Sequence, residues 1–135
     1  MQKMKKLLGI VVLSLLISGK VNAKDLTGVQ LLCDGYREYT AMGIDFKSSN
    51  TGTFYEIKNE NNWIIEKDEI NYRVTPDYIF MEGKKYKYKP SLYRKNLKLN
   101  NTFQCHKFDK KKNFEALMNF VLEELKNDSE KDNKL

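Results

Sequence analysis

The fold is indicated most clearly by residues 70–80, which read INYRVTPDYIF. Apolar and polar residues alternate in the first half of this stretch, and a period of two predicts a strand with one buried and one solvated face. Pro76 suits the second position of a type I turn, so 70–74 and 78–82 should form a β-hairpin. Antiparallel pairing is therefore the expected organisation of this region.

The same pattern continues on both sides of the hairpin. Turn-forming residues recur roughly every ten residues from 48 to 101, separated by runs rich in β-branched and aromatic residues. Further strands are expected at 28–33, 43–47, 85–89, 92–99 and 102–108, with Asn100-Asn101 as the turn between the last two. The sequence thus predicts a mainly β fold, an antiparallel meander of about eight strands that forms a small closed or partly open barrel.

The periodicity changes at Asn113. From there apolar residues occur at 114, 117, 118, 121, 122 and 125, which is one stripe of an α-helix. Residues 113–126 are expected to form one C-terminal amphipathic helix that packs on the barrel wall or covers one mouth. A helix lying on a membrane surface is the alternative. The polar tail 127–135 is expected to fray.

The first 23 residues have the pattern of a cleaved secretory signal peptide. Basic residues precede the apolar run 7–17, which is shorter than the roughly 20 residues that span a bilayer. Val21-Asn22-Ala23 then has the small residues of a cleavage site. The sequence predicts an exported protein, periplasmic or extracellular, whose single mature domain (24–126) has no transmembrane segment; an uncleaved anchor is the alternative.

The two cysteines are the most informative pair of residues. Cys33 falls in the first expected strand and Cys105 in the last. Cysteines of a small exported domain most often pair, and a disulfide requires Cα atoms within about 7 Å. A Cys33–Cys105 bond would therefore bring the first and last strands together, as closure of a barrel requires.

No motif of catalysis or of cofactor binding is present. The cysteine spacing and the single histidine, His106, do not match a metal or haem site, and no glycine-rich phosphate loop or nucleophile elbow occurs. Asp68 and Glu69 are neighbours on a strand and are expected on a solvated edge rather than in an acid–base pair. No catalytic residue, metal site or cofactor is predicted.

A basic stretch is the first candidate for function. Its cations are Lys84, Lys85, Lys87, Lys89, Arg94, Lys95 and Lys98. Such a face could bind a partner protein or an anionic envelope component, and a solvated strand face without function is the alternative. Without the lysines of the predicted signal peptide the formal charge falls from +6 to +2 (20 basic minus 18 acidic), so sequence-specific recognition of nucleic acid is not expected.

Aromatic residues are the second candidate. Those expected to face the barrel interior as possible pocket aromatics are Trp63, Tyr72, Phe80, Tyr86 and Tyr88. They could line a pocket for a small ligand, because buried tyrosines must place their hydroxyls on a partner. A core filled by side chains is the alternative, since an eight-stranded barrel is just wide enough to be filled in this way.

The layout resembles two families. It is similar to small lipocalin-type barrels, in which Leu26-Thr27-Gly28 would lie at the Gly-x-Trp motif, with Gln30 in place of the tryptophan. It also resembles small periplasmic barrels that inhibit lysozyme, on Cys33-Asp34-Gly35 in the first strand, although their Ser-Gly-x-x-Tyr loop is missing. The sequence predicts a non-enzymatic binding module; the alternatives are a small-ligand-binding lipocalin-like barrel and a small secreted hydrolase.

Overall fold

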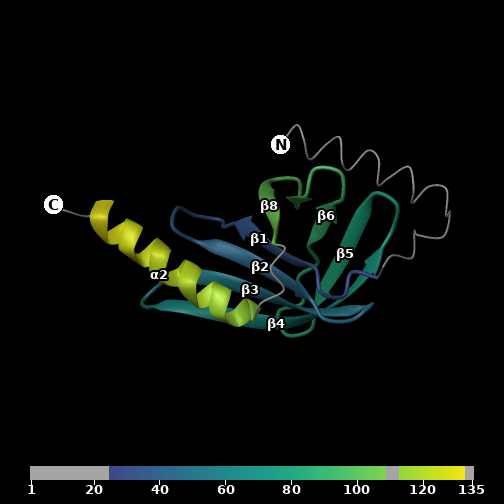
Figure 1. The fold of residues 1–135 in the computed structure, drawn as a ribbon, viewed down its shortest axis with the longest axis horizontal. Helices are drawn as coiled ribbons and strands as arrows, with labels where there is room; N and C mark the ends of the chain where they lie inside the picture. Colours follow the sequence, from purple (N-terminus) through teal and green to yellow (C-terminus); the bar gives the residue numbers. More distant parts are fainter. Residues whose placement is uncertain (1–24, 109–112, 133–135) are drawn as a thin grey trace.

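The computed structural model describes residues 25–108 and 113–132, which form eight strands and one helix (Figure 1). The elements are β1 (Gln30–Asp34), β2 (Ala41–Phe46), β3 (Thr51–Asn59), β4 (Trp63–Val74), β5 (Tyr78–Gly83), β6 (Ser91–Tyr93), β7 (Lys98–Leu99), β8 (Phe103–Phe108) and α2 (Phe114–Asp132). Each strand pairs with the next, and β8 pairs with β1. The predicted mainly β barrel with one C-terminal helix is confirmed, whereas the predicted signal peptide, 1–23, lies outside the described residues.

The barrel is closed by the predicted disulfide. Cys33 of β1 stands opposite Cys105 of β8 in the ladder, and their Cα atoms are 3.9 Å apart. Both residues are buried in the barrel core. A cross-link between positions 72 residues apart lowers the entropy of the unfolded chain and stabilises the fold by about 4 kcal/mol.

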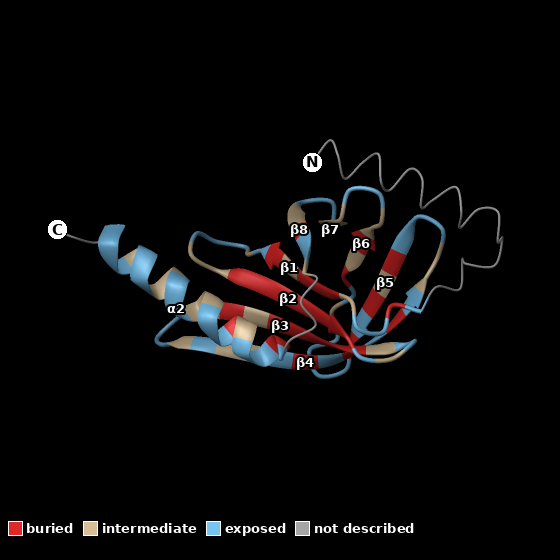
Figure 2. Cartoon of the chain, in the orientation of Figure 1, coloured by how far each residue is buried: buried red, intermediate tan, exposed pale blue. Residues whose placement is uncertain are grey.

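The barrel interior is packed with apolar side chains. Figure 2 shows the buried residues in red along the strands. The residues least accessible to solvent include Ile44, Phe46, Ile70, Leu92 and Leu99, which come from four different strands. Such interdigitated packing is what holds a small barrel together. The side chains thus fill the interior in the way that the narrow bore of an eight-stranded barrel favours.

Helix α2 packs on the outer wall, over β2, β3 and β4 (Figure 1). Its Phe114 and Met118 are buried against outward-facing residues such as Tyr55 and Ile57. Gly43 permits this close approach, because a Cβ there would lie 2.7 Å from the Met118 sulfur. Two positions were open for the helix, on the barrel wall or over one mouth of the barrel, and the structure shows it on the wall. In the part of the chain that is described, no helix is long and apolar enough to span a membrane.

The ends of the helix are set by local chemistry. The Asn113 side-chain oxygen accepts hydrogen bonds from the backbone N–H groups of Glu115 (3.0 Å) and Ala116 (3.3 Å), which caps the first turn. The helix continues to Asp132, beyond the predicted end at 126. The predicted helix end at 126 is therefore wrong, because polarity alone does not end a helix that contains neither glycine nor proline.

Two predicted strands differ in the structure. Residues 85–89 are a loop between β5 and β6, and 92–99 is divided into β6 and β7 by a turn in which Leu97 has a φ of 57°. The predicted turn at Asn100-Asn101 is confirmed, with φ values of 50° and 62°. In residues 85–99, alternation of side chains therefore predicts more strand than the structure contains.

Candidate functional site

The chain between β5 and β6 forms a lysine-rich loop of residues 84–89, which we call the lysine loop. Its four lysines are exposed, and none of them forms an ion pair with another residue of the described chain. Tyr86 is 44% exposed, and the Lys85 Nζ lies 5.2 Å from the centre of its ring. The lysine loop therefore presents positive charge without a counterion, beside an accessible aromatic ring.

A buried carboxylate holds the backbone of the lysine loop. The Asp68 Oδ1 accepts a hydrogen bond from the N–H of Lys85 at 2.8 Å, and its Oδ2 accepts one from the N–H of Tyr86 at 3.2 Å. Asp68 is only 4% exposed. Gly83 makes room for it, because a Cβ at that position would lie 2.4 Å from the Asp68 Oδ2. Charge-assisted bonds of this kind are stronger than neutral ones and fix the start of the loop.

The expectation that Asp68 lies on a solvated edge is wrong. On β4 it shares the inward-facing register of Ile70 and Tyr72, and all three are buried. If the alternation that starts at Ile70 is extended back to residue 68, Asp68 falls on the same inward face as Ile70 and Tyr72. Its neighbour Glu69 faces outward and is exposed.

Tyr88 anchors the other end of the lysine loop. Its carbonyl accepts a hydrogen bond from the N–H of Gly83 at 2.9 Å, and its ring packs edge-on against Phe54 of the barrel core. Burial raises the pKa of the Tyr88 hydroxyl, and the nearby charges of Asp68 and Glu56 raise it further. Tyr88 is therefore a neutral, half-buried anchor, and the loop is fixed at both ends.

The structure divides the predicted basic surface into two parts. The lysine loop precedes β6, whereas Arg94, Lys95 and Lys98 follow it at the opposite end of that strand. Arg94 is half-buried, and its Nη1 donates hydrogen bonds to the carbonyls of Thr75 (2.6 Å) and Pro76 (3.1 Å). The Arg94 guanidinium thus ties down the β4–β5 turn and contributes little free charge to the surface.

The possible pocket aromatics are also separated. Tyr72 lies in the barrel core, where its hydroxyl donates a hydrogen bond to the Ser48 carbonyl at 2.5 Å. Tyr86 and Tyr88 are stacked on each other in the lysine loop, with ring centres 6.5 Å apart. Of the five predicted aromatics, these two are the pair that the structure brings together.

The remaining two aromatics do not face the interior, because each lies in the outward register of its strand. Trp63 packs with the cluster beneath α2. Phe80 lies on the outer wall of β5, where the Arg73 guanidinium stands 4.5 Å from the ring centre. The predicted interior position of Trp63 and Phe80 is wrong, and the five residues do not line one pocket.

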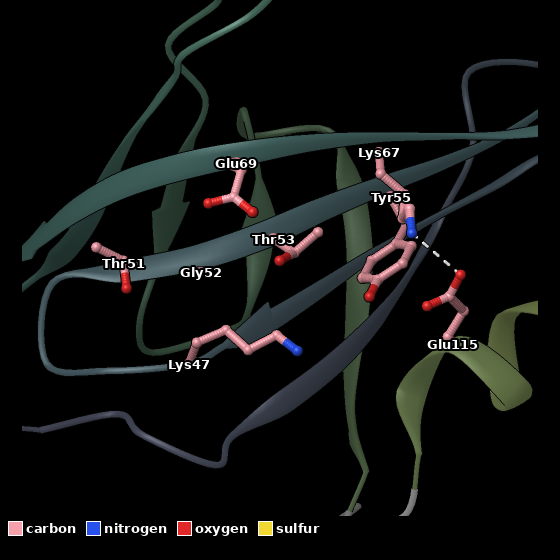
Figure 3. Close-up of a pocket in the computed structure, with 8 residues that line it drawn as sticks. All are labelled: Lys47, Thr51, Gly52, Thr53, Tyr55, Lys67, Glu69 and Glu115. Atoms are coloured by element: carbon pink, nitrogen blue, oxygen red, sulfur yellow. Dashed lines mark hydrogen bonds and ion pairs between the residues drawn. The ribbon is translucent and has the colours of Figure 1, made fainter.

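A second candidate site, which the sequence did not indicate, lies on the outer wall beside the start of α2 (Figure 3). It is a cavity of about 460 Å³. The residues that line it are Lys47, Thr51, Gly52, Thr53, Tyr55, Lys67, Glu69 and Glu115. Figure 3 shows that they come from β3, β4, the start of α2 and the chain that follows β2.

The charges around this cavity largely balance. Lys67 forms an ion pair with Glu115 at 3.1 Å, and Lys47 forms one with Asp45 at 3.2 Å. Burial, followed by the charges of Asp45, Glu115 and Glu69, raises the pKa of the Tyr55 hydroxyl to about 12. The tyrosine therefore stays protonated near neutral pH, and it is a poor base or nucleophile.

Residues that would suit hydrolysis do not form a common cleft. Glu66 and Asp68 lie on β4, whereas His106 is exposed on β8, which is not a neighbour of β4 in the barrel. Within residues 25–108 and 113–132, no group of three or more His, Cys, Asp and Glu side chains is arranged to hold a metal ion.

No protein-family model, no curated protein and no solved structure is similar enough to the chain to count as a match. The geometry of the lysine loop is therefore the basis for a functional assignment.

Proposed function

We propose that the protein is an exported, non-enzymatic binding module that attaches to an anionic surface of the cell envelope or extracellular space through the lysine loop. The observation that carries the proposal is the buried Asp68, which fixes the loop backbone while the four lysine side chains remain exposed without counterions. Export is supported by the signal-like residues 1–23 and by a disulfide of the kind found in oxidising compartments.

A fixed loop is a better binding element than a flexible one. Ordering a loop on binding costs conformational entropy, and a loop that is already ordered avoids that cost. In the lysine loop the hydrogen bonds to Asp68, together with the bond between Gly83 and Tyr88, order the backbone in advance. Only the lysine side chains then have to adjust to the partner.

The strength and the salt dependence of binding follow from the charge. A lysine close to an anionic membrane surface contributes about 1 kcal/mol, so four lysines give a dissociation constant on the order of 1 mM for one loop. Salt screens such interactions over about 10 Å at 0.1 M. The attachment should therefore be weak for a single loop, reversible and strongest at low ionic strength.

The lipocalin-like alternative receives less support. A ligand-binding barrel needs an interior cavity, whereas here side chains such as Phe46, Ile70 and Leu92 are fully buried in the interior. The two tyrosines that do lie together are in the lysine loop, where they can contact an anionic partner beside the lysines.

Co-sedimentation with vesicles tests the proposal. The wild-type protein is mixed at low salt with vesicles rich in phosphatidylglycerol or with purely zwitterionic vesicles, and the same is done for the loop variant Lys84→Glu with Lys87→Glu. Lys95→Glu with Lys107→Glu is the matched control, because it changes the net charge equally at exposed lysines outside the lysine loop.

We expect binding to anionic vesicles that the loop variant loses and the control largely keeps. Equal losses in the two variants would mean that only net charge matters. Absence of binding by the wild-type protein would contradict the proposal and favour a protein partner.

A further inference from the structure

The longest strand of the barrel is paired on only one side along its first half. β3 pairs with β4 from Trp63 to Asn71, but β5 pairs with it only from Ile70 to Val74. The last backbone hydrogen bond on the β5 side joins the Lys84 N–H to the Glu69 carbonyl at 2.9 Å. Residues 63–67 therefore form an open strand edge of the barrel; in Figure 1, β5 stands beside only the C-terminal part of β4.

The register shows which backbone groups face this opening. Even-numbered residues of β4 bond to β3, as the Tyr72 N–H does to the Asn50 carbonyl at 2.9 Å. Odd-numbered residues face the β5 side, so the N–H and C=O groups of Trp63, Ile65 and Lys67 point to the open edge. No other residue of the described chain bonds to these groups there.

Asp68 is the reason that the edge stays open. After Lys84 the chain could continue the ladder along β4, but the Asp68 carboxylate takes the N–H groups of Lys85 and Tyr86 instead. The lysine loop thereby turns toward the barrel, where Tyr86 and Tyr88 lie near Glu66 and Lys67, and its backbone does not pair with residues 63–67. An open edge is a template for pairing with another chain, and closed barrels usually have none.

We propose that a second copy of this chain adds to the open edge, with β4 antiparallel to β4 about a two-fold axis at Ile65. Such a contact has closed two-fold symmetry and stops at a dimer, because both chains use the same short segment. The segment also fits its own copy in length: Trp63 of each chain stands opposite Lys67 of the other, and the turn beyond Trp63 leads away toward β3. The contact is independent of the lysine loop, although it brings two such loops into one assembly.

Charge disfavours the registers shifted toward the lysine loop, and the start of the strand at Trp63 limits a shift the other way. With the axis at Ile65, the opposed pairs are Trp63 with Lys67, Ile64 with Glu66, and Ile65 with itself. Moving the axis to Glu66 would place two glutamates opposite each other, and moving it to Lys67 would place two lysines opposite each other. Like charges directly opposite in a ladder are destabilising.

The side chains at the edge support pairing. Ile64 is an exposed large apolar residue, at 38%, and Trp63 is only partly buried, so a neighbouring strand would cover both. Lys67, which stands opposite Trp63, would have to give up its ion pair with Glu115 to lie over the indole ring, so the apolar cover of Ile64 and Trp63 is what favours the pairing. The contact is small compared with a standard protein interface, so we expect a dissociation constant of about 0.1 to 1 mM.

Sedimentation equilibrium of the full chain tests the pairing at concentrations up to about 1 mM. We expect a monomer–dimer equilibrium for the wild-type protein and at least a tenfold weaker dimer for Lys67→Pro. The Lys67 N–H points to the open edge, so proline there removes a donor that only the second copy uses. Lys67→Ala is the matched control, because it removes the same side chain and keeps the N–H; it should still form the dimer.

Cysteine cross-linking tests the register without depending on how well the proline variant folds. Ile64→Cys and Glu66→Cys chains, mixed and oxidised, should give a cross-linked heterodimer, whereas Glu66→Cys alone should not. A wild-type protein that stays monomeric at the highest concentration would overturn the proposal, as would equal dimerisation of Lys67→Pro and Lys67→Ala. Cross-linking of Glu66→Cys with itself would overturn the register. Binding of a foreign extended segment to a monomeric chain would assign the edge to another occupant.

Discussion

The two loops that flank β6 both contain cationic residues, yet they are held in opposite ways. The lysine loop is fixed by Asp68, an acid from another strand that accepts hydrogen bonds from backbone N–H groups. The turn after β6 is fixed by its own Arg94, whose guanidinium donates to the carbonyls of Thr75 and Pro76. In the first case the cationic side chains remain free, and in the second the cation is itself the anchor. Where the anchor comes from decides whether the charge of a loop is available to a partner.

Removal of the disulfide should have the largest effect and should not distinguish the two loops. Cys33→Ser with Cys105→Ser is expected to lower the free energy of unfolding by about 4 kcal/mol, because the unfolded chain gains the freedom that the cross-link removed. Urea denaturation followed by circular dichroism measures this. Where the variant is still folded, its binding to anionic vesicles should equal that of the wild-type protein. A folded variant that binds more weakly would contradict the claim that the disulfide stabilises the barrel without taking part in binding.

Loss of the acid that anchors the lysine loop comes next. Asp68→Ala leaves the Lys85 and Tyr86 N–H groups without their acceptor and is expected to cost about 2 to 3 kcal/mol of stability. Glu69→Ala is the control, since Glu69 is an exposed neighbour on the same strand. Amide hydrogen exchange should increase in residues 84–89 for Asp68→Ala only. Unchanged exchange there would show that the acid does not order the loop.

Gly83→Ala tests the same anchor from the other side of the contact. The added Cβ would lie 2.4 Å from the Asp68 Oδ2, so the carboxylate must move away from the loop amides. We expect a loss of about 1 to 3 kcal/mol, as for other overpacked sites. If denaturation shows no loss, the close approach of Gly83 to Asp68 is not required.

The anchor of the second loop should affect stability but not binding. Arg94→Ala removes the hydrogen bonds to the Thr75 and Pro76 carbonyls and is expected to cost about 1 to 2 kcal/mol. Its attachment to anionic vesicles should decrease far less than that of Lys84→Glu with Lys87→Glu. A comparable decrease would mean that Arg94 belongs to the binding surface.

Much of the fold could be predicted from the sequence, because its determinants are local. Alternation of side chains predicted the hairpin around Pro76, and the positions of Cys33 and Cys105 predicted closure. The lysine loop could not be predicted in the same way, since lysine–tyrosine alternation suits a strand equally well. What turns it into a loop is Asp68, distant in sequence, which competes with the ladder for the N–H groups of Lys85 and Tyr86.

The candidate site could be predicted only in part for a related reason. Alternation indicates that two faces exist, but it does not say which residues share a face with the core over the whole length of β4. Local alternation therefore predicts Asp68 on a solvated edge and Trp63 on the inner face, whereas in the structure Asp68 faces inward and Trp63 faces outward. The cavity beside Tyr55 depends on where α2 packs, which no local pattern fixes.

The central claim is that Asp68 makes the lysine loop a binding element, and the affinity of Asp68→Ala for anionic vesicles tests it most directly. This variant keeps every lysine and loses one negative charge, so net charge alone would make it bind more tightly. Our account predicts binding several-fold weaker than that of the wild-type protein at low salt, because the loop must be ordered on attachment. Binding that is as tight as wild type, or tighter, would contradict it.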